Sequence, residues 1–239
     1  MRKSDLPFGS EFSPTQIDLS RVLEIASHRG GDWKAFEATV CAEYFAGNNT
    51  SDYNRRKLAN NTKLGMIAYG IIDRDARLTD FGRTLFDLRT DEAALYKALG
   101  RHILLNLHGL SLVQCIQDMQ IAGEEVNLTT LRESMAVRGI HYPPGGKHPS
   151  MMRLWLAKAG IIIGRRWQVD QIRLQDVLGA APDDFGVLAR FTAEQRAFLR
   201  ALANIGVSEP QPANAIAQLA HATYGVRFPE KSLPSPDYS

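Results

Sequence analysis

The sequence is poor in cysteine. Cys41 and Cys115 are the only two among 239 residues, and each falls within an apolar run of helical spacing. Two isolated cysteines cannot build a disulfide framework or a four-thiolate zinc site. We therefore expect both to be buried, reduced thiols, as in a cytoplasmic protein.

Long apolar runs are also missing. A membrane-spanning helix needs about 18 or more consecutive apolar residues, and no stretch of the chain reaches that length. The opening residues, MRKSDLPFGSEF, include basic side chains but no apolar segment after them, so they do not have the pattern of a secretory signal. These absences predict a cytoplasmic protein that does not contact a membrane.

Motifs that carry catalysis are absent as well. The sequence has no Gly-x-Ser-x-Gly, no phosphate-binding Gly-rich loop with a lysine, no Cys-x-x-Cys and no His-Glu-x-x-His. His141 and His148 have no cysteine or carboxylate close by that would complete a zinc site. We predict no catalytic residue, no metal site and no cofactor for this chain.

Acidic residues are missing from one long stretch, from Arg138 to Val169. The whole chain has a net charge of only +2, so an acid-free basic stretch indicates a segregated basic surface. Its basic residues are Arg138, Lys147, Arg153, Lys158, Arg165 and Arg166.

This stretch and the residues just before it have the punctuation of two helices. Thr130 and Glu133 have capping-box spacing at the start of the first helix, which Gly139 is expected to end. Pro149 suits the first turn of a second helix, SMMRLWLAKAG, because its missing N–H has no partner to lose there. Gly160 is expected to stop that helix.

A short hairpin is predicted to follow, with strands at Ile161–Ile163 and Trp167–Val169. Helix, turn, helix and basic hairpin is the layout of a winged helix that binds duplex DNA. Trp155 and Trp167 are expected in its core. The predicted DNA contacts are Lys147, His148, Ser150 and Arg153 near the start of the second helix and Arg165 and Arg166 at the hairpin tip.

An earlier stretch repeats this order of elements. Ser51 is expected to cap a helix whose apolar residues face inward, followed by a small hairpin and a helix capped by Thr79. The inward residues are predicted to be Leu58, Leu64, Ile67 and Ala68. Arginine and asparagine can make bidentate contacts to guanine and adenine, and the predicted DNA contacts of this helix are Asn54, Arg55, Arg56, Lys57, Asn60, Asn61 and Lys63.

The chain divides on this basis into three parts. Residues 1–107 are predicted to be a winged-helix domain with a linking helix at its end, and residues 108–180 a second winged-helix domain. Residues 188–239 hold two helices and a proline-rich tail, which we interpret as a partial third unit. Because two helices alone make a poor core, the chain is expected to be part of a longer protein.

The stretches YNRRKLANNTKLGMIAYGIID…LTDFGRTL and NLTTLRESM…GGKHPSMMRLWLAKAGII resemble two consecutive winged-helix domains, and FTAEQRAFLRALA…YGVRFPEKSLP is similar to the opening of a third. Tandem modules of this kind resemble the N-terminal target-recognition region of some bacterial restriction-type and defence endonucleases. The resemblance implies a mainly α fold with small β-wings and double-stranded DNA as partner. It also implies a catalytic domain elsewhere in the chain or in a separate subunit.

Two other functions are compatible with the same fold. A transcriptional regulator would act as a dimer on a two-fold symmetric site. A winged-helix platform for protein interaction in a multisubunit complex would fit the nearly balanced net charge.

Overall fold

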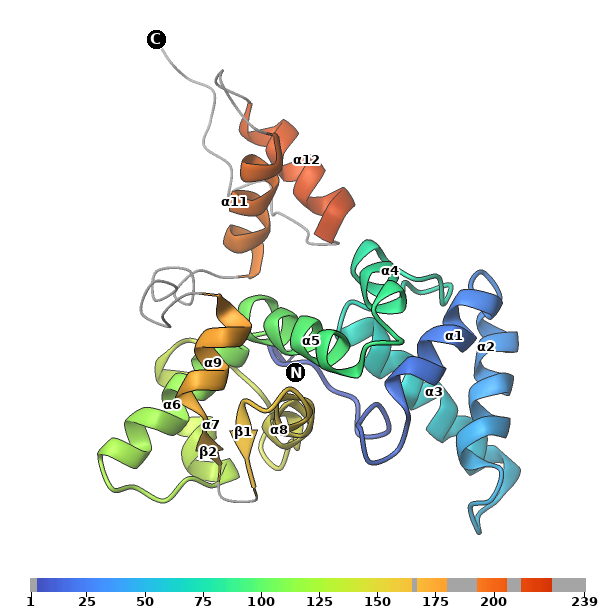
Figure 1. Ribbon diagram of the computed structural model, residues 1–239, viewed down its shortest axis with the longest axis horizontal. Helices are drawn as coiled ribbons and strands as arrows, with labels where there is room; N and C mark the ends of the chain where they lie inside the picture. Colours follow the sequence, from blue (N-terminus) through green and yellow to red (C-terminus); the bar gives the residue numbers. More distant parts are fainter. Residues whose placement is uncertain (1–3, 165–166, 180–192, 206–211, 225–239) are drawn as a thin grey trace. The chain divides into compact units, whose positions relative to one another are not determined.

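The computed structural model describes residues 4–164, 167–179, 193–205 and 212–224 (Figure 1). The chain comprises two compact units, residues 1–182 and residues 183–239. Within the described residues the fold is mainly helical with a small two-stranded antiparallel sheet, which confirms that part of the prediction.

The first unit contains the sheet and most of the helices. The strands are β1 (Ile162–Ile163) and β2 (Gln168–Val169). The helices, in chain order, are α1 (Leu19–Arg29), α2 (Trp33–Val40), the π-helical η1 (Cys41–Phe45), α3 (Asp52–Ala68), α4 (Asp80–Asp87), α5 (Glu92–Asn106), α6 (Gly109–Ile121), α7 (Leu128–Val137), α8 (His148–Lys158) and α9 (Gln171–Leu178).

Helix starts follow local side-chain caps. Asp32, Ser51 and Thr79 each cap the helix predicted for them by accepting a backbone N–H of its first turn. Pro149 lies in the first turn of α8, as predicted. Gly160 follows that helix with a φ of +77°, a conformation that glycine adopts without strain.

Two helix caps differ from those that the sequence predicts. Ser13-Pro14-Thr15-Gln16 has capping-box spacing and predicts a helix from Pro14. Ser13 closes only a single turn, and α1 begins after Asp18, whose carboxylate accepts a backbone N–H of the first turn at 2.7 Å. α7 begins at Leu128, inside the predicted range 127–130, but its capping box joins Asn127 and Thr130 instead of Thr130 and Glu133. In both cases the actual cap is a neighbouring Asp or Asn, whose side chain accepts a backbone N–H at least as well as Ser or Thr.

The first half of this unit runs from α1 to α4. η1 continues α2 without a break, and both pack along α3. After α3 the chain makes a tight hairpin, in which Ile72 and Leu78 form the predicted pairing as a single β-bridge. α4 then packs against α1.

The second half runs from α6 to α9. α6 packs on α7, and α8 leads directly into β1. In the hairpin Ile162 lies opposite Val169 and Ile163 lies opposite Gln168. The predicted strands are thus present, shortened by one residue each.

The two halves share one order of elements, and in each the hairpin lies against the end of the first helix. At the end of α1 the N–H of Gly31 donates to the carbonyl of Asp75 at 3.0 Å. At the end of α6 the Gln120 amide donates to the carbonyl of Trp167 at 3.1 Å. Figure 1 shows α1 to α4 on one side of α5, and α6, α7, α9 and the sheet on the other.

α5 holds contacts with both halves. It packs against α6, α8 and α9, and it also touches α4. Gly100 permits a close approach to α8, since a Cβ there would lie 2.7 Å from the Cβ of Ala159. On the other side His102 stacks on Phe81, with ring centroids 3.8 Å apart, and its Nε2 lies 3.0 Å from the Tyr69 carbonyl oxygen.

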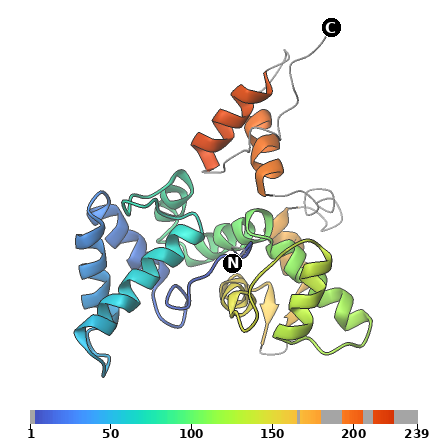
Figure 2. The same ribbon diagram turned by 180° about the vertical axis from the view of Figure 1, so that it is seen from behind.

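The N-terminal segment, residues 4–17, also connects the halves, running between α3 and α8 (Figure 2). Phe12 is fully buried between Tyr69 and Trp155, with centroids 5.3 and 4.9 Å away, and its carbonyl accepts the Trp155 indole N–H at 3.1 Å. At Gly65 a Cβ would lie only 2.4 Å from that of Phe12. The sequence predicts residues 1–13 to be a polar, extended lead, but Phe12 among them is part of the core.

The second unit contains α11 (Ala193–Ile205) and α12 (Ala213–Tyr224), both predicted from the sequence. They pack on each other through a small, alanine-rich cluster. Its buried members are Ala197, Ala201, Ile216 and Ala220.

Across the described part of the chain, none of the helices has the length and apolar character that crossing a membrane requires.

Candidate nucleic-acid interface

The first candidate interface is the outward side of α3. Its inward side carries Ala59, Thr62 and Met66, which are buried where α3 packs along α2 and η1. Residues spaced three, four and seven apart share one side of a helix. The opposite side, which we call the α3 face, therefore consists of Tyr53, Lys57, Asn60, Asn61 and Leu64.

The α3 face combines a cation, two amides and apolar surface. Tyr53 is 76% exposed and Leu64 is 51% exposed, while Lys57 is also exposed. Asn60 and Asn61 are half-buried, and no hydrogen bond of either side-chain amide is recorded within the described residues. These amides are available to an external donor and acceptor.

Two of the four cations of α3 are already paired. The Arg55 guanidinium binds the Asp52 carboxylate and donates to the Asn48 carbonyl at 3.2 Å. The Lys63 ammonium lies 2.5 Å from the Glu37 carboxylate. Arg56 and Lys57, both exposed, are the two cations of α3 for which the described residues show no such partner.

The predicted burial of two neighbouring α3 residues is wrong: one expected outside is buried, and one expected inside is exposed. Lys63, predicted to face outward, is 8% exposed and packs with its ammonium 4.4 Å from the Trp33 ring centroid. Leu64, predicted to face inward with Ala68, is exposed. Pairing with Glu37 and the aromatic ring offsets the cost of burying the Lys63 charge.

Asn54 is exposed at the start of α3, but its amide donates to the Thr50 hydroxyl at 3.0 Å. This bond supports the first turn of the helix. Asn54 therefore contributes less to an external contact than the amides of Asn60 and Asn61, about two turns further along.

The second predicted interface is largely enclosed. Of the residues of α8, all of which are described, only Ala157 and Lys158 are exposed. α5 packs along this helix, and Phe12 of the N-terminal segment covers Trp155. Trp155 and Trp167 are both buried, as predicted.

The residues predicted to contact DNA at the start of α8 separate by burial. Lys147 is exposed and Ser150 is half-buried. His148 is 5% exposed, between the rings of Phe8 and Tyr142 at 5.1 and 5.9 Å. Burial lowers the pKa of His148, so the ring is neutral at neutral pH. An enclosed neutral ring has no surface to offer DNA, which removes His148 from the interface.

The basic stretch is acid-free in sequence but not in space. Arg138 bonds to Asp118 of α6 at 2.5 Å, and Lys158 lies 3.5 Å from Glu92 of α5. The Arg153 guanidinium is half-buried, 5.0 Å from the Trp167 ring centroid. The predicted segregated basic surface is therefore partly neutralised by neighbouring helices. Arg165 and Arg166 lie outside the described residues.

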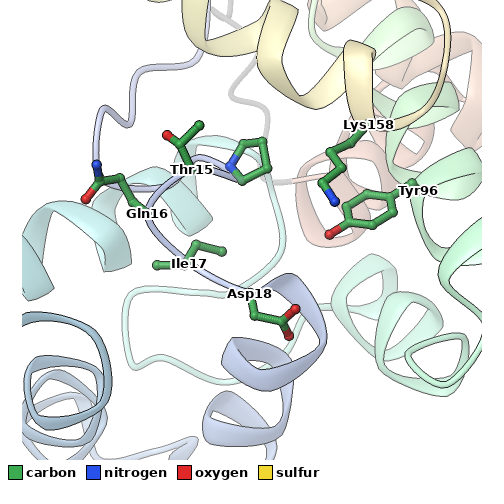
Figure 3. A pocket seen from close by; sticks show the side chains of 7 residues that line it. Thr15, Gln16, Ile17, Asp18, Tyr96 and Lys158 are labelled. Carbon is green, nitrogen blue, oxygen red and sulfur yellow. The ribbon is translucent and has the colours of Figure 1, made fainter.

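A polar pocket of about 280 Å³ lies between the N-terminal segment, α5 and α8 (Figure 3). In Figure 3 the Lys158 ammonium, the Tyr96 hydroxyl and the Asp18 carboxylate gather on one side of it. Burial, together with Asp18 and Glu92, raises the pKa of Tyr96 to about 12. The pocket is lined by Pro14, Thr15, Gln16, Ile17, Asp18, Tyr96 and Lys158.

This pocket does not have the parts of a catalytic site. The Tyr96 hydroxyl stays protonated at neutral pH, and the charge of Lys158 is shared with Glu92 and with the Tyr96 ring, whose centroid is 5.2 Å away. The Asp18 carboxylate caps α1. No general base therefore stands beside a nucleophile among the lining residues.

The cysteines and carboxylates do not form a reactive centre either. Both cysteines are free, and Cys41 is half-buried where full burial is predicted. Burial raises the pKa of Cys115, although Arg138 donates to its sulfur at 3.1 Å. Within the described residues there is no group of three or more His, Cys, Asp or Glu able to hold a metal ion.

Tyr53 and Leu64 belong to the candidate interface but are not among its predicted residues. Their spacing of eleven residues places them on one side of a helix, together with Lys57. That periodicity was available in the sequence. The apolar character of Leu64 instead predicted a place for it in the core.

Comparison of the chain with protein-family models, with curated proteins and with solved structures gave no match.

Proposed function

We propose that the chain binds double-stranded DNA through the α3 face, on a fold of two successive winged-helix units. The repeated order of three helical segments, hairpin and closing helix supports this fold. So does the position of each hairpin against the end of the first helix of its half. In winged helices the third helix enters the major groove and the hairpin lies beside it.

The observation that carries the proposal is the composition of the α3 face. A ligand made of phosphates and base edges requires cations together with side chains that donate and accept hydrogen bonds. Lys57 on the face and Arg56 beside it supply charge not committed to the described residues, and Asn60 and Asn61 supply open amides. Leu64 exposes apolar surface beside them.

The second half has a supporting role in this proposal. Because α8 is enclosed by α5 and the N-terminal segment, it does not enter a groove. Lys147, exposed at the N-terminus of α8, is suited to hold a phosphate beside the backbone N–H groups of the first turn. The two halves therefore contribute unequally, which differs from the two equivalent groove-binding helices expected from the sequence.

The biological setting remains the one that the resemblance implies. In this proposal the chain is the target-recognition region of a bacterial restriction-type or defence endonuclease. The catalytic domain belongs to another part of the chain or to a separate subunit. No cofactor takes part in recognition.

One observation favours a second function, a winged-helix platform for protein interaction. Ile121, Val137 and Ile172 are 87%, 89% and 83% exposed, at the ends of α6 and α7 and the start of α9. Large apolar side chains with such exposure are suited to a protein partner. This candidate predicts that loss of the α3 cations leaves the activity of the chain unchanged.

Fluorescence anisotropy with a random-sequence duplex distinguishes the two functions. We expect salt-sensitive binding by the wild type. Each phosphate contact contributes about 0.9 to the slope of log K against log salt, so Arg56→Ala with Lys57→Ala should reduce that slope by about 2.

The matched control removes the same charge elsewhere. Arg83→Ala with Lys97→Ala deletes an exposed cation of α4 and a half-buried cation of α5, each already paired with an aspartate. This control should bind as the wild type does. Absence of binding at low salt, or equal losses in both double variants, would refute the proposal.

A further inference from the structure

We infer that the α3 face selects A·T over G·C base pairs in the major groove. This inference rests on the proposed DNA binding and deepens it by naming the sequence class. It follows from which side chains lie on the face and which of the α3 cations are committed to the protein.

The two amides provide the adenine contact. An asparagine amide donates to N7 and accepts from the N6 amino group of adenine, and guanine does not offer this donor–acceptor pair. Asn60 and Asn61 are neighbours on the face, and their amides make no hydrogen bond to other described residues, so neither must break an internal bond to turn outward.

Leu64 provides an apolar contact one turn further along. Thymine alone presents a methyl group in the major groove, and apolar side chains pack against it. A cytosine at the same place has only C5–H where thymine has its methyl, so Leu64 loses that apolar contact. With Leu64 51% exposed beside Asn60 and Asn61, the amides and the methyl contact act on neighbouring base pairs.

The guanine-reading side chain is held away from this part of the face. Arginine is the commonest partner of guanine O6 and N7, but Arg55 is bound to Asp52 and to the Asn48 carbonyl. Arg56 comes one residue before Lys57 and so points about 100° around the helix from it. Arg56 thus faces the wall of the groove, where phosphates lie.

Lys57 is the only cation on the α3 face, one turn before the amides. In this arrangement it neutralises a phosphate, a contact that carries no base preference. The helix rises about 1.5 Å per residue, so Asn60 to Leu64 covers about 6 Å. At 3.4 Å per base pair, the A·T preference extends over about two base-pair steps.

The test uses the full chain and four short duplexes of mixed order. Their base pairs are A·T only, G·C only, A·U only and inosine·cytosine only. The A·U duplex lacks the thymine methyl. Inosine·cytosine resembles A·T in the minor groove but G·C in the major groove, so it shows which groove is read.

We expect the wild type to bind the A·T duplex about ten-fold more tightly than the G·C duplex, with inosine·cytosine as weak as G·C. Asn60→Ala with Asn61→Ala should remove most of this ratio. Replacing thymine by uracil should weaken the wild type about three-fold and leave Leu64→Ala unaffected. Lys57→Ala, the control on the same face, should weaken binding to A·T and G·C alike.

The outcomes separate this inference from the function on which it rests. Equal affinity for A·T and G·C, with the salt dependence and its loss in the Arg56 and Lys57 variant intact, would overturn the A·T preference and leave DNA binding standing. Inosine·cytosine bound as tightly as A·T would also overturn it, since the minor groove would then be read. Absence of binding to every duplex would refute both.

Discussion

Phe12 is the residue through which the N-terminal segment joins the two halves of the first unit. Its ring is fully buried and touches Tyr69 of the first half and Trp155 of the second. Replacement of Phe12 by alanine therefore removes contacts to both halves at once. We expect Phe12→Ala to destabilise the unit strongly.

The size of the effect follows from these contacts. Burying a phenylalanine side chain contributes about 1.5–3 kcal/mol, and each aromatic pair adds about 0.5–1.5 kcal/mol beyond the buried area. The cavity cannot collapse freely because Gly65 and the ring of Trp155 border it. The expected loss in free energy of unfolding is about 3–5 kcal/mol, the usual range for Phe→Ala in a core.

Urea unfolding followed by circular dichroism measures this loss through the midpoint and slope of the transition. Phe8→Ala is the matched control, since Phe8 belongs to the same segment but is 48% exposed. It should cost about 1 kcal/mol. A loss below about 1.5 kcal/mol for Phe12→Ala, or one equal to that of Phe8→Ala, would show that the segment does not join the halves.

Three further predictions concern stability. Burial lowers the pKa of His148 in the folded chain. The folded state should therefore lose stability as pH falls below about 6.5. In His148→Leu the urea midpoint should fall less with decreasing pH than in the wild type. Lys63→Ala leaves the half-buried Glu37 carboxylate without its cation and should cost about 3 kcal/mol. Arg56→Ala should stay within about 0.5 kcal/mol in the same urea assay. Asn127→Ala removes the cap of α7 and should lower the unfolding free energy by about 1 kcal/mol, and a loss near zero would contradict the capping assignment.

Helix positions were predictable where a short-range interaction determines them. The caps at Asp32, Ser51 and Thr79 each involve a side chain and a backbone N–H at most three residues away, so the sequence contains all the information. Where two candidate caps lie close together, the choice is decided by tertiary packing. Ser13 was expected to start a helix, but α1 begins after Asp18 because Phe12 and Ile17 on either side of that turn are both buried.

The orientation of α3 was only partly predictable. A lysine is usually exposed and a leucine usually buried, yet Lys63 lies inside and Leu64 outside. Glu37 determines this orientation. It belongs to α2, far from Lys63 in the sequence, and reaches Lys63 only when the two helices pack. For the same reason the sequence alone did not predict which residues make up the α3 face.

By itself the sequence determined the order and approximate bounds of the helices, the two hairpins and the absence of familiar catalytic motifs, because caps, glycines and apolar spacing act locally. Tertiary structure decided which of the basic residues remain open to a ligand. Asp118 and Glu92 approach the acid-free stretch from α6 and α5, and the N-terminal segment covers α8. Electrostatic interactions depend on distance in space and not on separation along the chain. The stretch with no acidic residue of its own is therefore partly neutralised by other helices, and it is the less accessible of the two candidate interfaces.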